Sequence, residues 1–431
     1  MQKKLYKYFY CLLSRYLNVW VSAADKTILC LHPSSMRLAG FFPKAEKWTG
    51  EIPDENPGAE LIVVDGRVHY ERDIQNFLVR IRSNCREGTR LVITFYSVLW
   101  RPLLRLATFL GWRNRTPEEN WLAPSDMENL LRLADFEMIT LDSRVICPLY
   151  IPWLSDFLNS FIAPLPFFRR LAMVNILLAR PCCHSSHTGG KRPSVSIVVP
   201  ARNEAGNIED AVLRLPPMGP DDELIFVEGG SSDDTWTKIQ EVSEKYRGRR
   251  NIVIARQDGH GKGDAVHKGF ALASREILMI LDADLTVPPE DLPKFYETLV
   301  AGKGEFINGS RLVYPMEGQA MRFFNMLGNK FFALAFTFVL GQSLKDTLCG
   351  TKVLTRDHYR KLASQRRYFG EFDPFGDFDL LFGAARLGLK IVEVPIVYRD
   401  RVYGATNISR WKHGSILLRM LIFGAGRLRF I

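Results

Sequence analysis

The stretch ILMILDADLTVPPEDL, which runs from Ile277 to Leu292, decides how the rest of the chain is interpreted. It opens with five apolar residues, a pattern typical of a strand buried on both faces of a sheet. Asp282 and Asp284 follow directly. Because burying two carboxylates is costly unless they meet water, a cation or hydrogen-bond donors, we expect them at the carboxyl edge of an open α/β sheet.

At such an edge the two carboxylates would form an oxygen-ligand site for Mg²⁺ or Mn²⁺ that carries a phosphorylated substrate. For an isolated Asp-x-Asp sequence, however, a helix N-cap is the better explanation, since Asp, Thr and Pro also open helices. The choice between a cation site and a helix N-cap therefore depends on the motifs that accompany Asp282 and Asp284.

Composition limits the class of protein. The chain has 431 residues, of which 47% are hydrophobic and 24% charged, enough for two or three folded domains and unlike a disordered protein. The net charge of +10 favours anionic partners such as nucleotide sugars or phospholipid surfaces. Nucleic acid is not expected as a partner, because the basic residues are dispersed without aromatic interleaving.

Seven cysteines without framework spacing favour reduced thiols in a cytosolic compartment.

No signal peptide is expected, and no apolar run is long enough for a membrane span. Three runs come part-way, at residues 161–178, 331–341 and 415–430. The last carries arginines and suits a helix that lies in the interface of an anionic membrane. This predicts a peripheral protein on the cytoplasmic side of a membrane. The alternative is a terminal helix packed on the core with its arginines in solvent.

The first part of the chain reads as alternating strands and helices. Strands are expected at residues 27–31, 60–66 and 90–96, with helices near 74–81 and 124–133. This pattern predicts an α/β layer domain, which we place at residues 1–180, followed by a small, polar, glycine-rich linker at 181–193.

Two segments of this domain carry a resemblance: VVDGRVHYERDIQNFLVRIRSNCREGTRLVITFYS and NWLAPSDMENLLRLADFEMI. Over residues 59–145 they resemble the C-terminal half of Rossmann-like, S-adenosylmethionine-dependent methyltransferases. Where that family has a glycine-rich turn after its first strand, this chain has LHPSSMRLAG at 31–40, which lacks the glycines that let backbone approach a nucleotide closely. The resemblance therefore implies a shortened, degenerate relative that serves as a docking or scaffolding domain, with an active methyltransferase as the alternative.

Three further predicted strands end in polar residues, as the strand before Asp282 does. VSIVVPARNEAGNI delivers Arg202, Asn203 and Glu204 to its carboxyl end. ELIFVEGGSSDDT delivers Glu228 and two glycines, and NIVIARQDGHGKGDAVHKGF opens a helix with glycines around Lys262. Four successive strands that bring polar residues to one edge are hard to explain by folding alone.

These segments, followed by INGSR, DTLCGTKV and EVPIVYRDRVYGATNIS, occur in the order found in family 2 glycosyltransferases of the GT-A fold. Over residues 194–403 the chain most resembles the dolichol- or other polyprenyl-phosphate mannose or glucose synthases. We therefore expect a GT-A domain at 194–431. The resemblance implies a metal-dependent, inverting hexosyltransferase that uses a GDP- or UDP-hexose and a dolichyl or undecaprenyl phosphate.

The resemblance also assigns residues. The nucleotide would meet Pro200, Ala201, Arg202, Glu204, Glu228, Gly261, Lys262 and Gly263, and the cation on its diphosphate would be held by Asp282 and Asp284. Thr286 stands where the family often has Gln. Arg311 would touch a phosphate, and Arg401 and Lys412 could face the acceptor phosphate. Asp346, Lys352, Asp377 and Asp379 match positions near the sugar.

Two alternatives remain open from the sequence. One is a transferase of the same fold that acts on a soluble glycan or protein acceptor. The other is a non-catalytic scaffold whose transferase site has decayed, because Glu228 and Thr286 depart from the family pattern. The sequence also leaves open whether the chain forms a homo-oligomer or binds a membrane-protein partner.

Overall fold

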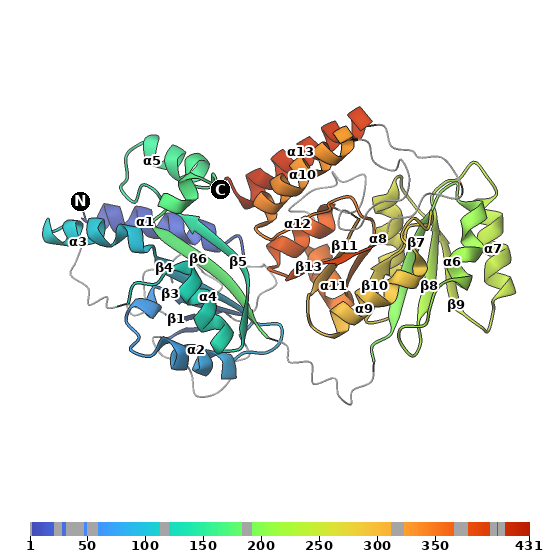
Figure 1. The fold of residues 1–431 in the computed structure, drawn as a ribbon, viewed down its shortest axis with the longest axis horizontal. Helices are drawn as coiled ribbons and strands as arrows, with labels where there is room; N and C mark the ends of the chain where they lie inside the picture. Colours follow the sequence, from blue (N-terminus) through green and yellow to red (C-terminus); the bar gives the residue numbers. More distant parts are fainter. Residues whose placement is uncertain are drawn as a thin grey trace. The chain divides into compact units, whose positions relative to one another are not determined.

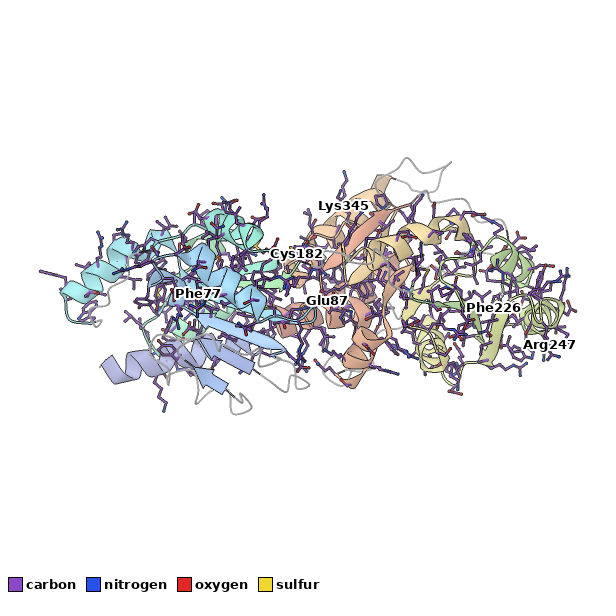
Figure 2. The ribbon with its side chains drawn as sticks, turned by 90° about the horizontal axis from the view of Figure 1, so that it is seen from below. Phe77, Glu87, Cys182, Phe226, Arg247 and Lys345 are labelled. Atoms are coloured by element: carbon purple, nitrogen blue, oxygen red, sulfur yellow. The ribbon has the colours of Figure 1, made fainter. Side chains whose placement is uncertain are left out.

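A computed structural model describes residues 2–20, 28–31, 47–49, 59–112, 120–182, 192–311, 323–365, 378–396, 403 and 410–431. The chain divides into two compact units, shown in Figure 1. The N-terminal unit comprises Met1–Cys183 with Arg386–Gly388 and Ala425–Ile431. The C-terminal unit comprises His184–Ala385 with Leu389–Gly424. Each has its own core, to which Phe77 and Phe226 respectively contribute (Figure 2).

The N-terminal unit is built on a six-stranded mixed sheet in the order β2-β1-β3-β4-β6-β5. Strands β1 (Ile28–Leu31), β2 (Lys47–Thr49), β3 (Leu61–Asp65) and β4 (Arg90–Tyr96) pair in parallel. Strand β6 (Val174–Pro181) runs antiparallel between β4 and β5 (Phe136–Arg144). The three predicted strands are confirmed, and the apolar side chains of β3 and β4 are buried because both faces of the sheet are covered.

The helices of this unit contribute to two clusters of buried side chains. Helices α2 (Ile74–Ser83) and α4 (Pro124–Leu133), both predicted, contribute to one cluster with the sheet. Helix α1 (Gln2–Leu17) contributes Leu12, Leu13, Tyr16 and Leu17 to the other. Helix α3 (Arg101–Phe109) contributes no buried side chain.

The apolar run at residues 161–178 is not a single segment. It is divided among short helical turns and a strand: α5 (Leu154–Phe157), η4 (Leu158–Ile162) and η5 (Phe168–Leu171) precede β6. The sequence does not predict β6, because a continuous apolar run fits a buried helix as well as a strand inside a sheet.

The C-terminal unit is built on a seven-stranded mixed sheet in the order β13-β11-β12-β10-β7-β8-β9. Strands β7 (Val195–Ala201), β8 (Glu223–Glu228), β9 (Asn251–Arg256) and β10 (Ile277–Ile280) form its parallel part. Strand β12 (Lys352–Thr355) runs antiparallel between β10 and β11 (Phe306–Ser310), and β11 pairs in parallel with β13 (Ile391–Pro395). The predicted α/β class is thus confirmed in both units, and both sheets are mixed.

The C-terminal unit also contains eight α-helices within the described residues. They are α6 (Ile208–Leu213), α7 (Thr235–Lys245), α8 (Lys262–Leu272), α9 (Leu292–Val300), α10 (Phe323–Leu340), α11 (Arg356–Ser364), α12 (Phe378–Arg386) and α13 (Arg410–Leu428). Among the residues that the structure describes, no helix is both long and apolar enough to cross a membrane.

The strand directions fix where the polar loops lie. The carboxyl ends of β7, β8, β9, β10 and β11 meet at one edge of the sheet, because all five strands point the same way. Strand β12 is antiparallel and therefore enters the sheet at that same edge. The loop before Lys352 consequently lies beside the loop after β10.

Candidate active site

The loops after β7 and β8 are bound to each other. Asn203 has a left-handed backbone conformation, with φ at 56°. Its Oδ1 accepts a hydrogen bond from the backbone of Ser232 at 2.8 Å, and its backbone N–H donates to the Ser231 hydroxyl at 3.0 Å. Asparagine tolerates this backbone conformation better than most residues do. The two loops thus form one preorganised rim.

Glu204 and Glu228, both predicted to face the nucleotide, are buried in this rim. Glu228 accepts a hydrogen bond from the backbone of Ser231 at 2.5 Å, and Glu204 accepts from the Asn207 side chain at 2.8 Å. Both carboxylates therefore stabilise the conformations of their own loops through these hydrogen bonds. Of the other predicted nucleotide contacts, Pro200 and Ala201 end β7, with Ala201 buried, and Arg202 is exposed.

The glycine-rich loop leads into α8. Gly261 caps this helix with a backbone φ of 87°, a conformation that favours glycine, and Gly263 is buried in its first turn. The helix begins at Lys262, whose Nζ lies 2.6 Å from Asp282 Oδ1. The loop after β9 and the loop after β10 are thereby joined through an ion pair at the carboxyl edge.

Asp282 lies among several positive charges. Burial would raise the pKa of its carboxyl group, but Lys262, Lys352 and Arg311 hold this pKa below its usual value. Gly350, in the loop before β12, packs so closely that an added Cβ would overlap both Asp282 Oδ2 and Lys262 Nζ. Lys352 itself is fully buried and donates to the Cys349 carbonyl. The Asp282 carboxylate is therefore ionised, with Lys262 paired to one oxygen and Gly350 packed against the other.

Asp284 is only partly buried, and Thr286 holds its carboxylate. Both the backbone N–H and the hydroxyl of Thr286 donate to Asp284 Oδ1, at 3.1 and 2.8 Å. Leu285, between them, has a positive φ of 51°, which costs energy in a residue with a large side chain. Thr286 stands where the family often has Gln. Its position in the structure gives it a different role, because it is buried and orients Asp284.

The aspartate pair suits a hard cation. Mg²⁺ and Mn²⁺ prefer carboxylate oxygens, and Mg²⁺ is commonly bound by one or two carboxylates together with substrate phosphates. The described residues contain no cluster of three or more acidic, histidine or cysteine side chains that would hold an ion without substrate. Two buried hydroxyls, on Ser310 next to Arg311 and on Thr351 next to Lys352, have no hydrogen-bond partner among the described residues.

Arg311 and Asp346, each predicted as a separate catalytic residue, form one ion pair. The Arg311 Nε and a terminal nitrogen donate to the two carboxylate oxygens at 2.7 and 2.9 Å, and the Arg311 backbone adds a bond of 3.0 Å. Burial would raise the pKa of Asp346, but Arg311 and backbone donors hold it below its usual value. Asp346 therefore positions Arg311. The Arg311 side chain is only 16% exposed, so this ion pair is largely shielded from solvent.

A second acidic group lies on α12. Asp379 Oδ2 is 2.9 Å from His267 Nε2 on α8, and His267 Nδ1 is 3.1 Å from the Tyr359 hydroxyl on α11. His267 was not singled out from the sequence, because a lone histidine on a helix gives no signal for a partner far along the chain. Asp377 and Arg401 lie outside the described residues, as does the side chain of Lys412.

Comparison with known proteins assigns the family. Residues 196–363, which contain both aspartates, match the family described as Glycosyl transferase family 2. The chain is 30% identical over 227 residues to Glycosyltransferase AglJ of Haloferax volcanii, which is 52% of this chain and 69% of that protein. The chain belongs to glycosyl transferase family 2. The family assignment agrees with the expected GT-A fold of the C-terminal region.

A second relative of this chain is a dolichol-phosphate mannosyltransferase of Pyrococcus furiosus, which is 31% identical to it over 221 residues. That match covers 50% of this chain, and this chain spans only 59% of the relative's length. A solved structure, glucosyl-3-phosphoglycerate synthase of Mycobacterium tuberculosis in complex with Mn²⁺, UDP and glucosyl-3-phosphoglycerate, aligns at a TM-score of 0.41 with 23% identity. This alignment covers 57% of this chain and 82% of the synthase.

Proposed function

We propose that the chain is a metal-dependent, inverting glycosyltransferase that moves a hexose from a GDP- or UDP-hexose to a polyprenyl phosphate. The observation that carries the proposal is the Asp282–Asp284 pair at the carboxyl end of β10, held by Lys262 and Thr286. The polyprenyl acceptor is supported by the name of the dolichol-phosphate mannosyltransferase relative.

Asp282 and Asp284 would hold the divalent cation through their carboxylate oxygens. When bound, such an ion neutralises the negative charge that develops on a departing diphosphate. The chain's own residues prepare for this. Lys262 and Gly350 fix Asp282, and Thr286 fixes Asp284, so that both carboxylates are oriented before the substrate arrives.

The acceptor needs little activation, because a phosphate oxygen is already anionic. In an in-line displacement that oxygen forms a bond to the anomeric carbon, and the bond from this carbon to the donor diphosphate breaks with its electron pair leaving on the diphosphate. The anomeric centre is inverted. Asp346 is committed to Arg311, so we assign it a positioning role and propose that Arg311 contacts a phosphate.

The test is a transfer assay with the full chain, a panel of GDP- and UDP-hexoses and a short polyprenyl phosphate, with and without Mg²⁺ or Mn²⁺. We expect a glycolipid product that requires a cation. Product formed at the same rate in the presence of a chelator would overturn the metal role. Transfer to a soluble glycan or peptide, but not to the lipid, would favour the alternative acceptor class.

For the N-terminal unit we propose a shortened, methyltransferase-like scaffold without catalytic activity. Its support is the resemblance over residues 59–145 and the absence of a glycine-rich turn from the sequence at 31–40. Isothermal titration with S-adenosylmethionine should give no binding heat. Micromolar binding would instead favour an active methyltransferase.

We also propose a peripheral location on the cytoplasmic side of a membrane. Helix α13 exposes Leu418, Arg419 and Ile422 while burying Leu417 and Met420. Arg429, beyond the helix, is buried in the N-terminal unit, so deleting the C-terminus would also remove a structural residue. A double substitution, Leu418→Glu with Ile422→Glu, is therefore the better test. Unchanged binding to liposomes would reject a membrane role for α13.

A further inference from the structure

The N-terminal unit has an exposed apolar surface that the proposed transferase chemistry does not use. Helix α3 and its flanks have no fully buried side chain, and only Trp100 and Leu104 pack partly against the core. Instead, leucines spaced for one helix face are exposed together with aromatic residues: Leu99 (62%), Leu103 (52%), Leu106 (53%), Phe109 (86%), Leu110 (47%) and Trp112 (48%). A soluble surface rarely gathers so much apolar area without a partner.

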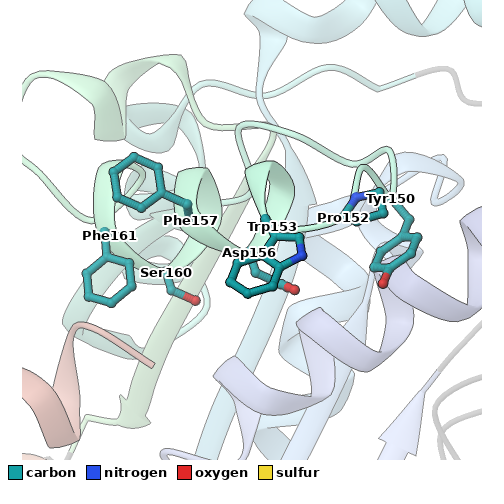
Figure 3. A pocket seen from close by; sticks show the side chains of 7 residues that line it. All are labelled: Tyr150, Pro152, Trp153, Asp156, Phe157, Ser160 and Phe161. Carbon is teal, nitrogen blue, oxygen red and sulfur yellow. The ribbon is translucent and has the colours of Figure 1, made fainter.

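A second group of exposed aromatic residues lies on the segment from Leu149 to Leu171. Figure 3 shows several of them projecting from its turns. The most exposed are Trp153 (90%) and Phe167 (72%), followed by Tyr150, Phe157 and Phe161. Trp153 also has a positive backbone φ of 66°, a strained conformation for a bulky residue that contributes nothing to the core.

The two groups belong to one surface. A hollow of about 380 Å³ is lined almost entirely by apolar side chains from α1, α3 and residues 146–149. Leu103 and Leu106 line it from α3, and Leu149 lines it from the other segment. The Trp100 indole, at the start of α3, donates to the Leu171 carbonyl at 2.7 Å. We call the surface formed by residues 98–112 and 149–171 the apolar face.

The charges on this face are almost all positive. Residues 97–112 and 147–172 contain four arginines (Arg101, Arg105, Arg169 and Arg170) and one acidic residue, Asp156. Asp156 accepts a hydrogen bond from the Tyr8 hydroxyl at 3.1 Å. Arg101, Arg105 and Arg170 are exposed. Aromatic and leucine side chains next to arginines are typical of surfaces that bind anionic lipid bilayers.

We propose that the apolar face docks on an anionic lipid bilayer, with α3 and the exposed aromatic side chains entering the headgroup region and the arginines contacting lipid phosphates. The charge of the face favours this occupant over a second apolar protein surface, which would leave the arginines without anionic partners. The proposal does not depend on the cation site or on the donor. A lipid-docking N-terminal unit would nevertheless suit an enzyme whose acceptor lies in a membrane.

The test uses the full chain in co-sedimentation with phosphatidylcholine vesicles, with and without phosphatidylglycerol. We expect binding only to the anionic vesicles, weakened by salt. Leu103→Glu combined with Leu106→Glu should reduce binding by about tenfold or more, since it places charge in the inserted stripe. The matched control is Leu133→Glu, on α4 of the same unit and equally exposed (54%), which should bind as the parent chain does.

A second pair of variants separates a loss of lipid binding from a loss of folding. Trp153→Asn, which suits the positive φ, and Arg101→Gln combined with Arg105→Gln should each weaken binding severalfold while leaving the thermal unfolding curve unchanged. Equal binding by all variants would overturn the proposal. So would a change in oligomeric state in light scattering without loss of vesicle binding, because the apolar face would then contact another protein chain.

Discussion

At the scale of single residues, the strongest prediction concerns Asp284. Asp284→Asn keeps the shape of the side chain and the hydrogen bond from Thr286, but it replaces a charged ligand with a neutral one. We expect transfer to fall by about a hundredfold or more, because neutralising a departing diphosphate contributes several kcal/mol to the reaction barrier. Steady-state rates at saturating Mn²⁺ measure this.

The control for Asp284→Asn is its thermal unfolding curve, which should match that of the parent chain because the side chain is only partly buried. A rate within a few-fold of the parent rate would mean that Asp284 does not hold the cation.

Thr286 allows a sharper test of positioning. Thr286→Val keeps the buried volume and removes the hydroxyl that donates to Asp284 Oδ1 at 2.8 Å. We expect kcat to fall by about tenfold and the free energy of unfolding to drop by about 1 kcal/mol, the usual contribution of one hydrogen bond. Thr286→Ser, which retains the hydroxyl, should keep most of the activity. Equal rates for the Val and Ser variants would show that the hydroxyl does not orient the carboxylate.

Single residues also show where sequence reasoning ends. The positions of Asp282 and Asp284 at a strand end followed from a buried apolar run that stops at two carboxylates. The pairing of Arg311 with Asp346 did not follow, because it depends on β11 and the loop before β12 meeting at one edge. Sequence spacing carries no information about such a contact, so two residues predicted to act separately form a single unit.

At the scale of elements, strand direction was the hardest feature to predict. The parallel strands β7 to β10 each end in a recognisable motif, and their helices follow from apolar periodicity. β12 has no such signal: four residues, Lys352–Thr355, enter the sheet antiparallel between β10 and β11. Likewise, β6 was hidden in an apolar run. Both strands are inserted between partners that lie far away in the chain, so their places depend on tertiary packing.

The loop before β12 gives a prediction at this scale. Gly350→Ala would place a methyl group against Asp282 Oδ2 and Lys262 Nζ. We expect a loss of transfer activity of at least tenfold with a cost to stability of about 1–3 kcal/mol, since the loop or the carboxylate has to move. Gly328→Ala, on α10, is the control because its added Cβ meets nothing within 4 Å. If both variants keep full activity, Asp282 does not need its present position.

At the scale of the whole molecule, the last residues of the chain, Ala425–Ile431, belong to the N-terminal unit. Arg429 lies 2.9 Å from Asp142 on β5, and Arg144 contributes a second ion pair at 2.8 Å and donates to the Arg429 carbonyl. All three side chains are almost fully buried. The sequence suggested that Arg429 faces water or lipid headgroups. This expectation is wrong, because the guanidinium groups of Arg429 and Arg144 both pair with the buried carboxylate of Asp142.

This cluster makes the N-terminal unit sensitive to acid. Burial would raise the pKa of Asp142, but Arg144 and Arg429 lower it to about 2 from its ordinary value of 3.8. Because the folded-state pKa is depressed, the stabilisation is fully present above about pH 4 and is lost as the pH falls toward 2, a change of about 2 kcal/mol. We therefore predict a drop of this size in the free energy of unfolding between pH 5 and pH 2, beyond what exposed carboxylates contribute.

Asp142→Asn isolates this contribution. At pH 6 the substitution leaves two buried arginines without their shared carboxylate, so it should destabilise the N-terminal unit by about 3 kcal/mol in a urea titration. As the pH falls from 4 toward 2, Asp142 is protonated first in the unfolded parent chain and then in the folded one, so the difference in stability between the two proteins should shrink. Glu128→Gln, which removes an exposed pair with Arg132 at 3.9 Å, should change stability by less than about 0.5 kcal/mol at either pH. A difference that stays constant from pH 6 to pH 2 would mean that Asp142 contributes through its shape and hydrogen bonds and that its charge is not what joins the C-terminus to β5.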